Sequence, residues 1–302
     1  MPPISELVSR RLGEGSSSSL WVYLIIYRCT LYYDTINIAM IINIHEHLWG
    51  SDAIEPYDIV EVAERYGFDI TCISKVELPG GRFPKNPTRW ECRSNNLDVY
   101  RLVKSHHNKF LGFCLINPLE AGAVDDFEGW IKDEGFRGLK LYTSVYADDP
   151  SVDPLAEKAA ELGVPILFHV EWAWPSLYPR DGRFRYDPSP SDKRSNGLHI
   201  ARLAKRHPDT VIINGHVNML GQDWEASIKA VGHCPNVYAD LSGSGSSRGC
   251  VEFAVRELGA GRCLFGTDGS IAPTLGAVRG ACISDEERDL VLSGNARRIL
   301  NI

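Results

Sequence analysis

The sequence predicts a (β/α)8 barrel of the TIM type, and three observations lead to that prediction. Eight short apolar runs rich in β-branched residues alternate with helix-like stretches after Met40. The runs are apolar on both faces, as parallel strands covered on both sides must be. Eight such strands within about 260 residues is the number that closes a parallel barrel. A doubly wound open sheet is the alternative, but no G-x-G-x-x-G motif follows the first run.

The predicted elements alternate regularly along the chain. Strands are expected at Ile41–Ile44, Ile70–Ile73, Leu111–Ile116, Gly138–Tyr142, Pro165–Val170, Val211–Ile213, Val237–Leu241 and Cys263–Phe265. Helices are expected at Tyr57–Tyr66, Asn96–His106, Ala123–Glu134, Asp153–Leu162, Gly197–Arg206, Trp224–Val231, Cys250–Leu258 and Asp285–Ile302. Asp153 and Pro154 provide one of these helices with an N-cap and a first-turn proline.

Residues 1–39 do not follow this pattern. They contain four consecutive serines at Ser16–Ser19. The apolar run Leu20–Tyr27 that follows is far shorter than the roughly 20 residues that cross a bilayer. We therefore interpret residues 1–39 as an N-terminal extension of doubtful structure and residues 40–302 as the barrel domain.

Composition and charge narrow the classes of function. The chain of 302 residues carries a formal net charge of −7, so nucleic acid and anionic membranes, which are polyanions, are not expected as partners. Its eight cysteines include no C-x-x-C pair, which favours free buried thiols in a reducing cytoplasm. The expected partner is a small molecule, and a homo-oligomer is compatible with the sequence.

Chemistry-bearing side chains occur where the predicted strands end, which is where barrel enzymes build their active sites. The first strand runs into His45-Glu46-His47. Residues two apart on a strand share a face, so both imidazoles should point into the barrel mouth while Glu46 points away. Two imidazoles on one face suit a divalent metal ion, and a hydrogen-bonded pair of core histidines is the alternative.

Three later strands end in the same kinds of residue. His169 ends the fifth strand, His216 the sixth and Asp268 the eighth. Four histidines and one aspartate that converge from four strands are hard to explain by packing, because a buried aspartate without a cation or a donor is costly. The sequence therefore predicts a metal site.

The residues around these strand ends resemble the amidohydrolase superfamily, in particular the branch that includes aminocarboxymuconate semialdehyde decarboxylase and resorcylate decarboxylase. The resemblance covers roughly residues 40–302. It rests on His45-x-His47, Gly138-Leu139-Lys140-Leu141, Pro165–His169, Gly215-His216, Leu264–Asp268 and Gly294–Arg298.

The resemblance implies that His45, His47, His169 and Asp268 hold one catalytic divalent ion. Zinc is the first expectation, manganese or another ion is an alternative, and two ions are less favoured. It also implies that His216 acts beside the metal as an acid, a base or a polarising residue. Val217-Asn218 after this histidine departs from the glycine or other small residues that the family often has.

Lys140 on the fourth predicted strand has several interpretations. In binuclear members of the superfamily a carboxylated lysine on this strand bridges two ions, and His169 and His216 would then bind the second one. In the branch that the sequence resembles, a lysine here contacts the substrate as a charge or a hydrogen-bond donor. A structural ion pair is the remaining alternative.

Three functions are compatible with this site. A bound divalent ion lowers the pKa of water to near 7. The leading prediction is therefore a metal-dependent hydrolase of a lactone, an amide or a related C–O or C–N bond, with Asp268 accepting the proton of that water and His216 assisting. The alternative is a non-oxidative decarboxylase of a carboxylated ring or unsaturated acid. The third is a barrel without catalytic activity.

The loops after the second and fifth strands are predicted to bind the substrate. Both carry net positive charge in an acidic chain, which indicates a small anionic substrate such as a carboxylate. The candidate contacts are Arg82, Arg89, Trp172, Arg180 and Arg183, with Arg248 after the seventh strand as a further clamp. An ordinary solvated loop with aromatic anchors is the alternative.

Overall fold

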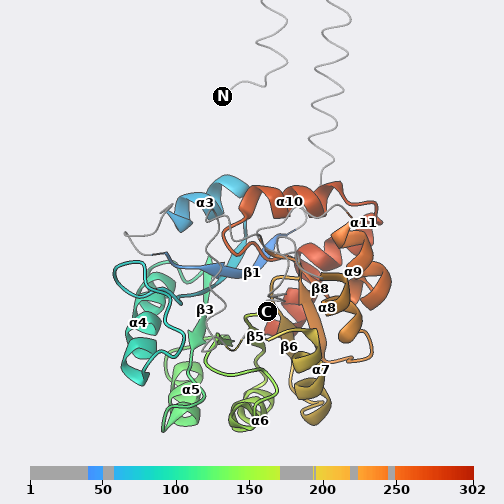
Figure 1. The fold of residues 1–302 in the computed structure, drawn as a ribbon. Helices are drawn as coiled ribbons and strands as arrows, with labels where there is room; N and C mark the ends of the chain where they lie inside the picture. The colour runs from blue at the N-terminus through green and yellow to red at the C-terminus, as the bar shows by residue number, and fades with distance from the viewer. Residues whose placement is uncertain (1–39, 50–57, 171–192, 194, 218–223, 244–248) are drawn as a thin grey trace, which may run out of the picture. The chain divides into compact units, whose positions relative to one another are not determined.

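The computed structural model describes residues 40–49, 58–170, 193, 195–217, 224–243 and 249–302. Within them, eight parallel strands follow one another in chain order, each hydrogen-bonded to the next, and helices surround them (Figure 1). This arrangement confirms the predicted barrel. The extension predicted at residues 1–39 lies outside the described residues.

The strands are short and the helices between them are mostly amphipathic. The strands are β1 (Ile42–His47), β2 (Ile70–Ser74), β3 (Phe110–Leu115), β4 (Gly138–Leu141), β5 (Ile166–Phe168), β6 (Ile212–Asn214), β7 (Val237–Asp240) and β8 (Cys263–Leu264). The α-helices are α3 (Ile59–Tyr66), α4 (Arg89–Ser105), α5 (Ala123–Lys132), α6 (Asp153–Leu162), α7 (Gly197–Arg206), α8 (Trp224–Ala230), α9 (Cys250–Leu258), α10 (Ile271–Gly280), α11 (Asp285–Asp289) and α12 (Asn295–Leu300). None of the described helices is both long and apolar enough to cross a bilayer.

The start of α4 and the N-terminal cap of α6 differ from the sequence prediction. Helix α4 begins at Arg89 instead of Asn96, because Thr88 and Glu91 form a capping box. Asp153 is the first residue of α6 and not its N-cap, since a 3-10 turn, η1 (Pro150–Val152), precedes it and is capped by Asp149. The Asp153 carboxylate instead lies 2.8 Å from Nε2 of His207.

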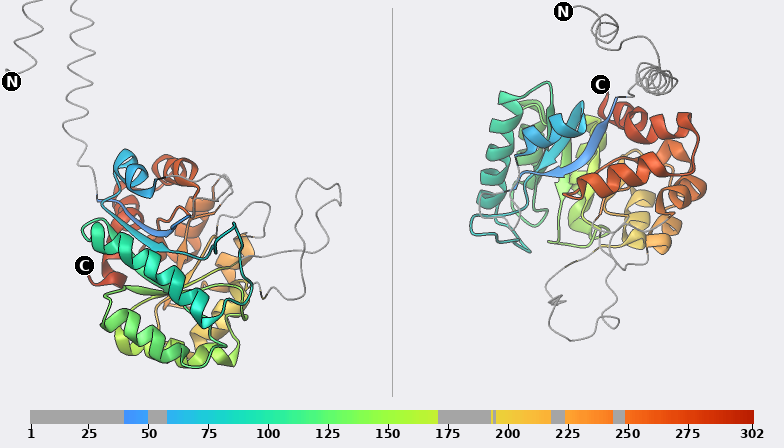
Figure 2. Two further views of the ribbon diagram at one scale, coloured as in Figure 1. Left: turned by 90° about the vertical axis from the view of Figure 1, so that its left-hand side faces the viewer. Right: turned by 90° about the horizontal axis from the view of Figure 1, so that it is seen from above.

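The barrel closes between its last strand and its first. Strand β8 is only two residues long, and the chain beyond it continues the pairing with β1. Ile44 N–H donates to the carbonyl of Phe265 at 2.9 Å, and Thr267 N–H donates to the carbonyl of His45 at 3.0 Å. In both views of Figure 2 the blue first strand accordingly lies against the red C-terminal part of the chain.

The C-terminal helical segment, residues 290–300, supports this closure through hydrogen bonds. The π-helical turn η3 (Leu290–Gly294) presents the carbonyl of Val291 to Phe265 N–H at 3.0 Å. The buried Asn295 side chain donates to the carbonyls of Ala260 and Cys263, which flank the start of β8. The Gly294–Arg298 motif thus holds β8 in place.

Two apolar layers form the core. The larger one lies between the strands and the surrounding helices. The smaller one fills the barrel interior with Ile42, Ile44, Cys72, Phe113, Leu167, Ile213 and Leu264, and residues of α12 complete it. Gly138 on β4 is required here, since a Cβ at this position would lie 2.7 Å from the Phe113 ring. Because side chains fill the barrel interior, polar groups of a site are expected at the carboxyl ends of the strands.

Candidate metal centre

Three side chains from β1 and the segment after β8 form a compact cluster at the carboxyl end of the barrel. One ligand atom each of His45, His47 and Asp268 lies within 4.8 Å of the other two. Asp268 Oδ1 is 3.1 Å from Nε2 of His47 and 3.5 Å from Nε2 of His45. Among the described residues this trio is the group of His, Cys, Asp and Glu side chains with the spacing of a metal site.

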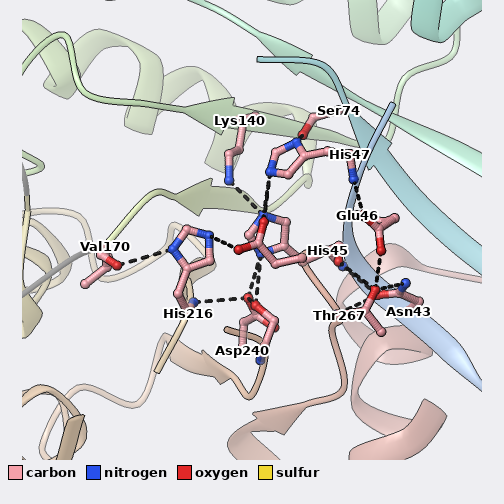
Figure 3. A network of polar contacts seen from close by, with 12 residues as sticks. Asn43, His45, Glu46, His47, Ser74, Lys140, Val170, His216, Asp240 and Thr267 are labelled. Atoms are coloured by element: carbon pink, nitrogen blue, oxygen red, sulfur yellow. Dashed lines mark hydrogen bonds and ion pairs between the residues drawn. The ribbon is translucent and has the colours of Figure 1, made fainter. Parts of the chain in front are cut away.

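The two imidazoles meet as the i, i+2 spacing predicts. The Nε2 atoms of His45 and His47 are 3.3 Å apart, and both residues are buried (Figure 3). The pairing of β1 with β2 shifts register between Asn43 and Glu46, so β1 carries an extra residue at this point. Such a bulge re-aims side chains at the rim of a barrel. Ser74 at the end of β2 lies 3.2 Å from Nδ1 of His47 and fixes the second ring.

Glu46 points away from the trio, as expected, and holds the segment that carries Asp268. Its carboxylate is fully buried and accepts hydrogen bonds from the Thr267 hydroxyl at 2.5 Å, from Gly269 N–H and from His47 N–H. The Asn43 side chain donates to the same hydroxyl at 2.6 Å. Asp268 itself has φ of 46°, a left-handed conformation that is uncommon for a non-glycine residue and needs such support.

His216 and Lys140 approach the trio from β6 and β4. Nε2 of His216 is 3.2 Å from Oδ2 of Asp268, and the His216 ring stacks on that of His45 with centroids 4.8 Å apart. Lys140 is fully buried, and its Nζ lies 2.9 Å from Nε2 of His45 (Figure 3). Both residues therefore lie in the cluster that the strand ends predicted.

Asp240, at the end of β7, is a site residue that the sequence analysis missed. It is fully buried, and its Oδ2 lies 2.7 Å from Nδ1 of His45 and 3.2 Å from the backbone N of His216. Ser242 donates to it through its hydroxyl and its backbone N–H. The sequence could have indicated this residue, because Asp240 ends an apolar strand, as Asp268 follows one.

Burial and the neighbouring charges set the protonation states of the cluster. Burial lowers the pKa of His216 well below its ordinary value, and burial together with Lys140 does the same at His45. Burial alone would raise the pKa of Asp268, but His216, His45 and His47 outweigh it and hold that pKa well below the usual range. The His45 and His216 imidazoles are therefore neutral and Asp268 is ionised at neutral pH, which are the forms that bind metal.

Burial also shifts the pKa values of Lys140 and Asp240, and in each case it disfavours the charged form. Burial lowers the pKa of Lys140 to about 8, although the charges of Asp268 and Asp240 oppose the change. Burial raises the pKa of Asp240, against its hydrogen bonds from Ser242 and the nearby His216. Two imidazole nitrogens and one ionised carboxylate fit a divalent ion such as zinc or manganese and leave coordination positions open for other ligands.

The comparison with known families matches this arrangement. The family model described as "Amidohydrolase" matches residues 42–302, which is nearly the whole barrel. The chain belongs to the amidohydrolase family. As a member of this family it is an enzyme, and the superfamily inferred from the strand-end motifs is confirmed. No curated relative matches the sequence.

Solved structures share the fold of this amidohydrolase. A 2,6-dihydroxybenzoate decarboxylase from Rhizobium is 18% identical, with a TM-score of 0.64 over 87% of this chain and 98% of that chain. A dihydroxybenzoic acid decarboxylase from Polaromonas sp. JS666, solved with bound manganese and the inhibitor 2-nitroresorcinol, is 19% identical, with a TM-score of 0.66 over 87% and 97%. A 5-carboxyvanillate decarboxylase from Sphingomonas paucimobilis is 19% identical, with a TM-score of 0.65 over 87% and 99%.

The remaining predicted ligand, His169, lies next to the trio and not within it. Its ring packs against that of His216 at 4.5 Å between centroids and against Tyr142 at 4.7 Å. The strand-end argument thus brings this side chain into the same cluster. Its role as a ligand of the amidohydrolase metal stays a prediction.

The arginines predicted to clamp the substrate have other partners where the structure describes them. Arg89 forms a bidentate ion pair with Asp126 of α5, and Arg82 pairs with Glu91 of α4. Both guanidinium groups are more than half exposed. These ion pairs hold both guanidinium groups at carboxylates of α4 and α5, and a substrate role for them stays a prediction. Trp172, Arg180, Arg183 and Arg248 lie outside the described residues.

Proposed function

We propose that this amidohydrolase is a metal-dependent, non-oxidative decarboxylase of a small aromatic carboxylate. The observation that carries the proposal is a series of aromatic rings that leads away from the trio. The Trp49 ring meets the His47 ring edge to face at 5.4 Å, and Phe83 meets Trp49 at 6.2 Å. Phe83 is 46% exposed. A flat aromatic substrate fits edge-to-face and stacked contacts of this kind.

The comparisons favour decarboxylation over the hydrolase activity that the sequence analysis put first. Three of the solved structures described above are named as decarboxylases of hydroxylated or methoxylated benzoates, and one of them carries manganese. The hydrolase is therefore the second candidate. It is favoured by the ionised Asp268 beside neutral imidazoles, which suits acceptance of a proton from water.

The charges of the cluster are compatible with an anionic substrate. His45, His47 and Asp268 would hold one divalent ion, with His169 as the further ligand to test. Such an ion, when bound, stabilises negative charge on an oxygen of the substrate. Lys140 adds a buried positive charge 2.9 Å from His45, so the ion and Lys140 together outweigh the two carboxylates Asp268 and Asp240.

The Asp268–His216 pair is suited to deliver the proton that decarboxylation requires. When the bond from the ring carbon to the carboxyl carbon breaks, carbon dioxide leaves and the ring carbon takes up a proton. Nδ1 of His216 lies 3.3 Å from the carbonyl of Val170 and donates to it, so Nε2 faces Oδ2 of Asp268 at 3.2 Å. With Nδ1 carrying the His216 hydrogen and Asp268 ionised, the pair would first take up a proton from solvent. That proton, held between Nε2 and Oδ2 beside the trio, would then pass to the ring carbon, and solvent would supply the next one.

A substrate panel distinguishes the two activities. The full-length protein, loaded with manganese or with zinc, is incubated with 2,6-dihydroxybenzoate, 5-carboxyvanillate and a set of lactones. We expect release of carbon dioxide in step with loss of the aromatic acid, detected by trapping the gas and by chromatography. Asp268→Asn should be inactive, and Arg206→Ala, on the surface of α7, serves as the control. Lactone hydrolysis without release of carbon dioxide would establish the hydrolase instead.

A further inference from the structure

Asp240 is a buried carboxylate that contacts two residues of the cluster without belonging to the trio. We propose that Asp240 is a positioning residue that fixes the ring tautomer of His45 and the backbone of His216, and thereby sets the affinity of the centre for its divalent ion. The proposal depends on the metal centre of the proposed function and not on the reaction that the centre catalyses.

Two independent contacts define the same tautomer of His45. Oδ2 of Asp240 accepts from the Ser242 hydroxyl and the His216 N–H, so it is also the acceptor toward Nδ1 of His45 at 2.7 Å, and Nδ1 carries the hydrogen. Nζ of Lys140 can only donate, and it lies 2.9 Å from Nε2 of the same ring, so Nε2 presents its lone pair. The Nε2 atom with this lone pair lies 3.3 Å from Nε2 of His47 (Figure 3). It also lies 3.5 Å from Oδ1 of Asp268.

The second contact of Asp240 reaches His216. The His216 backbone N–H donates to Oδ2 at 3.2 Å, and His216 has φ of 56°. This left-handed conformation turns the His216 side chain toward Asp268, and an acceptor on its N–H helps to hold it. One carboxylate on β7 therefore orients side chains on β1 and β6.

The carboxylate has little freedom to move. Ser242 donates to Oδ2 through its hydroxyl at 2.5 Å and to Oδ1 through its backbone N–H at 3.0 Å. A Cβ at Gly266 would collide with Oδ1 of Asp240 and would lie 3.0 Å from Cβ of His45. Gly266 in the Leu264–Asp268 motif is thus explained by the space that Asp240 occupies.

A residue that only stabilised the end of β7 would affect folding and leave the metal centre unchanged. Carboxylates that accept a hydrogen bond from a ligating histidine typically change metal affinity 10- to 100-fold when they are replaced. Metal affinity and the protonation pattern of the His45 ring therefore separate the two roles, and neither measurement requires a substrate.

The experiment compares Asp240→Asn and Asp240→Ala with the wild-type full-length protein. Asp153→Asn is the control, because the Asp153 carboxylate also lies 2.8 Å from an imidazole, that of His207, and neither residue belongs to the cluster. Affinity for Mn²⁺ and Zn²⁺ is measured by competition with a chelator. The tautomer of His45 in the metal-free protein is read from long-range ¹H–¹⁵N spectra of the imidazoles, with His45→Asn used for assignment.

We expect the wild-type His45 ring to carry its hydrogen on Nδ1. Asp240→Asn should bind both ions about 10- to 100-fold more weakly, and Asp240→Ala should populate the Nε2–H tautomer, while Asp153→Asn matches the wild type. If Asp240→Ala does not fold, the affinity and tautomer of Asp240→Asn decide the question. Wild-type affinity and tautomer in Asp240→Asn, with or without a lower Tm, would overturn the proposal. Inactivity of every variant on every substrate would count against the proposed reaction alone.

Discussion

Replacement of Glu46 tests whether the segment that carries Asp268 is held by one buried carboxylate. Glu46→Ala removes the acceptor of three donors, namely the Thr267 hydroxyl, Gly269 N–H and His47 N–H. The hydroxyl can turn toward the carbonyl of His45, which lies 3.4 Å away. The two backbone N–H groups would lose this acceptor, and Gly269 is only partly buried.

The expected loss of stability follows from those two groups. A buried donor left without an acceptor costs about 1–3 kcal/mol. Two such donors, one of them reachable by water, amount to about 2–4 kcal/mol of the free energy of unfolding. This is a large share of the 5–15 kcal/mol that is typical of a folded domain. Freed from Glu46, Asp268 should also leave its left-handed conformation, so we expect metal affinity to fall with stability.

The assay is urea unfolding followed by circular dichroism, with chelator present and then with Mn²⁺ in excess. We expect Glu46→Gln to lose less stability than Glu46→Ala, because the amide keeps one acceptor oxygen. Glu61→Ala removes an exposed ion pair with Arg65 and should change stability by less than about 0.5 kcal/mol. A Glu46→Ala protein within that range of the wild type, with unchanged metal affinity, would refute the reasoning.

Three further predictions concern the metal centre and the thiols. His216→Asn should keep its metal affinity in chelator competition while kcat falls by about 10²–10⁴; loss of the ion would make His216 a ligand. Asp268→Asn should fold, by circular dichroism, yet bind metal weakly and turn over at background; normal turnover would exclude Asp268 from the site. Burial raises the pKa of the Cys92 and Cys250 thiols to about 12, so among the described cysteines exposed Cys282 should be alkylated first at pH 8, as mapped by peptide mass spectrometry. Equal labelling of Cys92 in folded protein would contradict this.

The sequence was sufficient for the barrel and for most of the cluster, because strand ends obey a simple geometric rule. Parallel strands bring their carboxyl ends to one face, so polar residues at those ends meet there. His45, His47, His216, Lys140 and Asp268 follow that rule. The i, i+2 spacing also placed Glu46 on the opposite side, although the bulge in β1 was not foreseen.

What the sequence did not predict depends on partners distant in the chain. Asp240 was missed although it ends a strand. Its neighbours in the sequence do not show whether such a carboxylate orients a histidine, because that histidine, His45, is 195 positions away. The sequence analysis did not predict that Arg89 and Arg82 pair with Asp126 and Glu91 on neighbouring helices, while their role at a substrate stays a prediction. For long, flexible cations, the nearest carboxylate decides the direction of the side chain, and a charge count over a loop cannot supply it.

The seam between β8 and β1 constrains the order of events during synthesis. Thr267 contacts Asn43 and Glu46 across 224 and 221 positions of sequence. A nascent chain that has emerged only as far as β7 contains both histidines of the trio and no Asp268, so it cannot assemble the trio. An ion held by the complete trio would therefore be captured only after translation of nearly the whole barrel. Closure between residues this far apart in the chain is slow, so the complete trio would assemble late in folding.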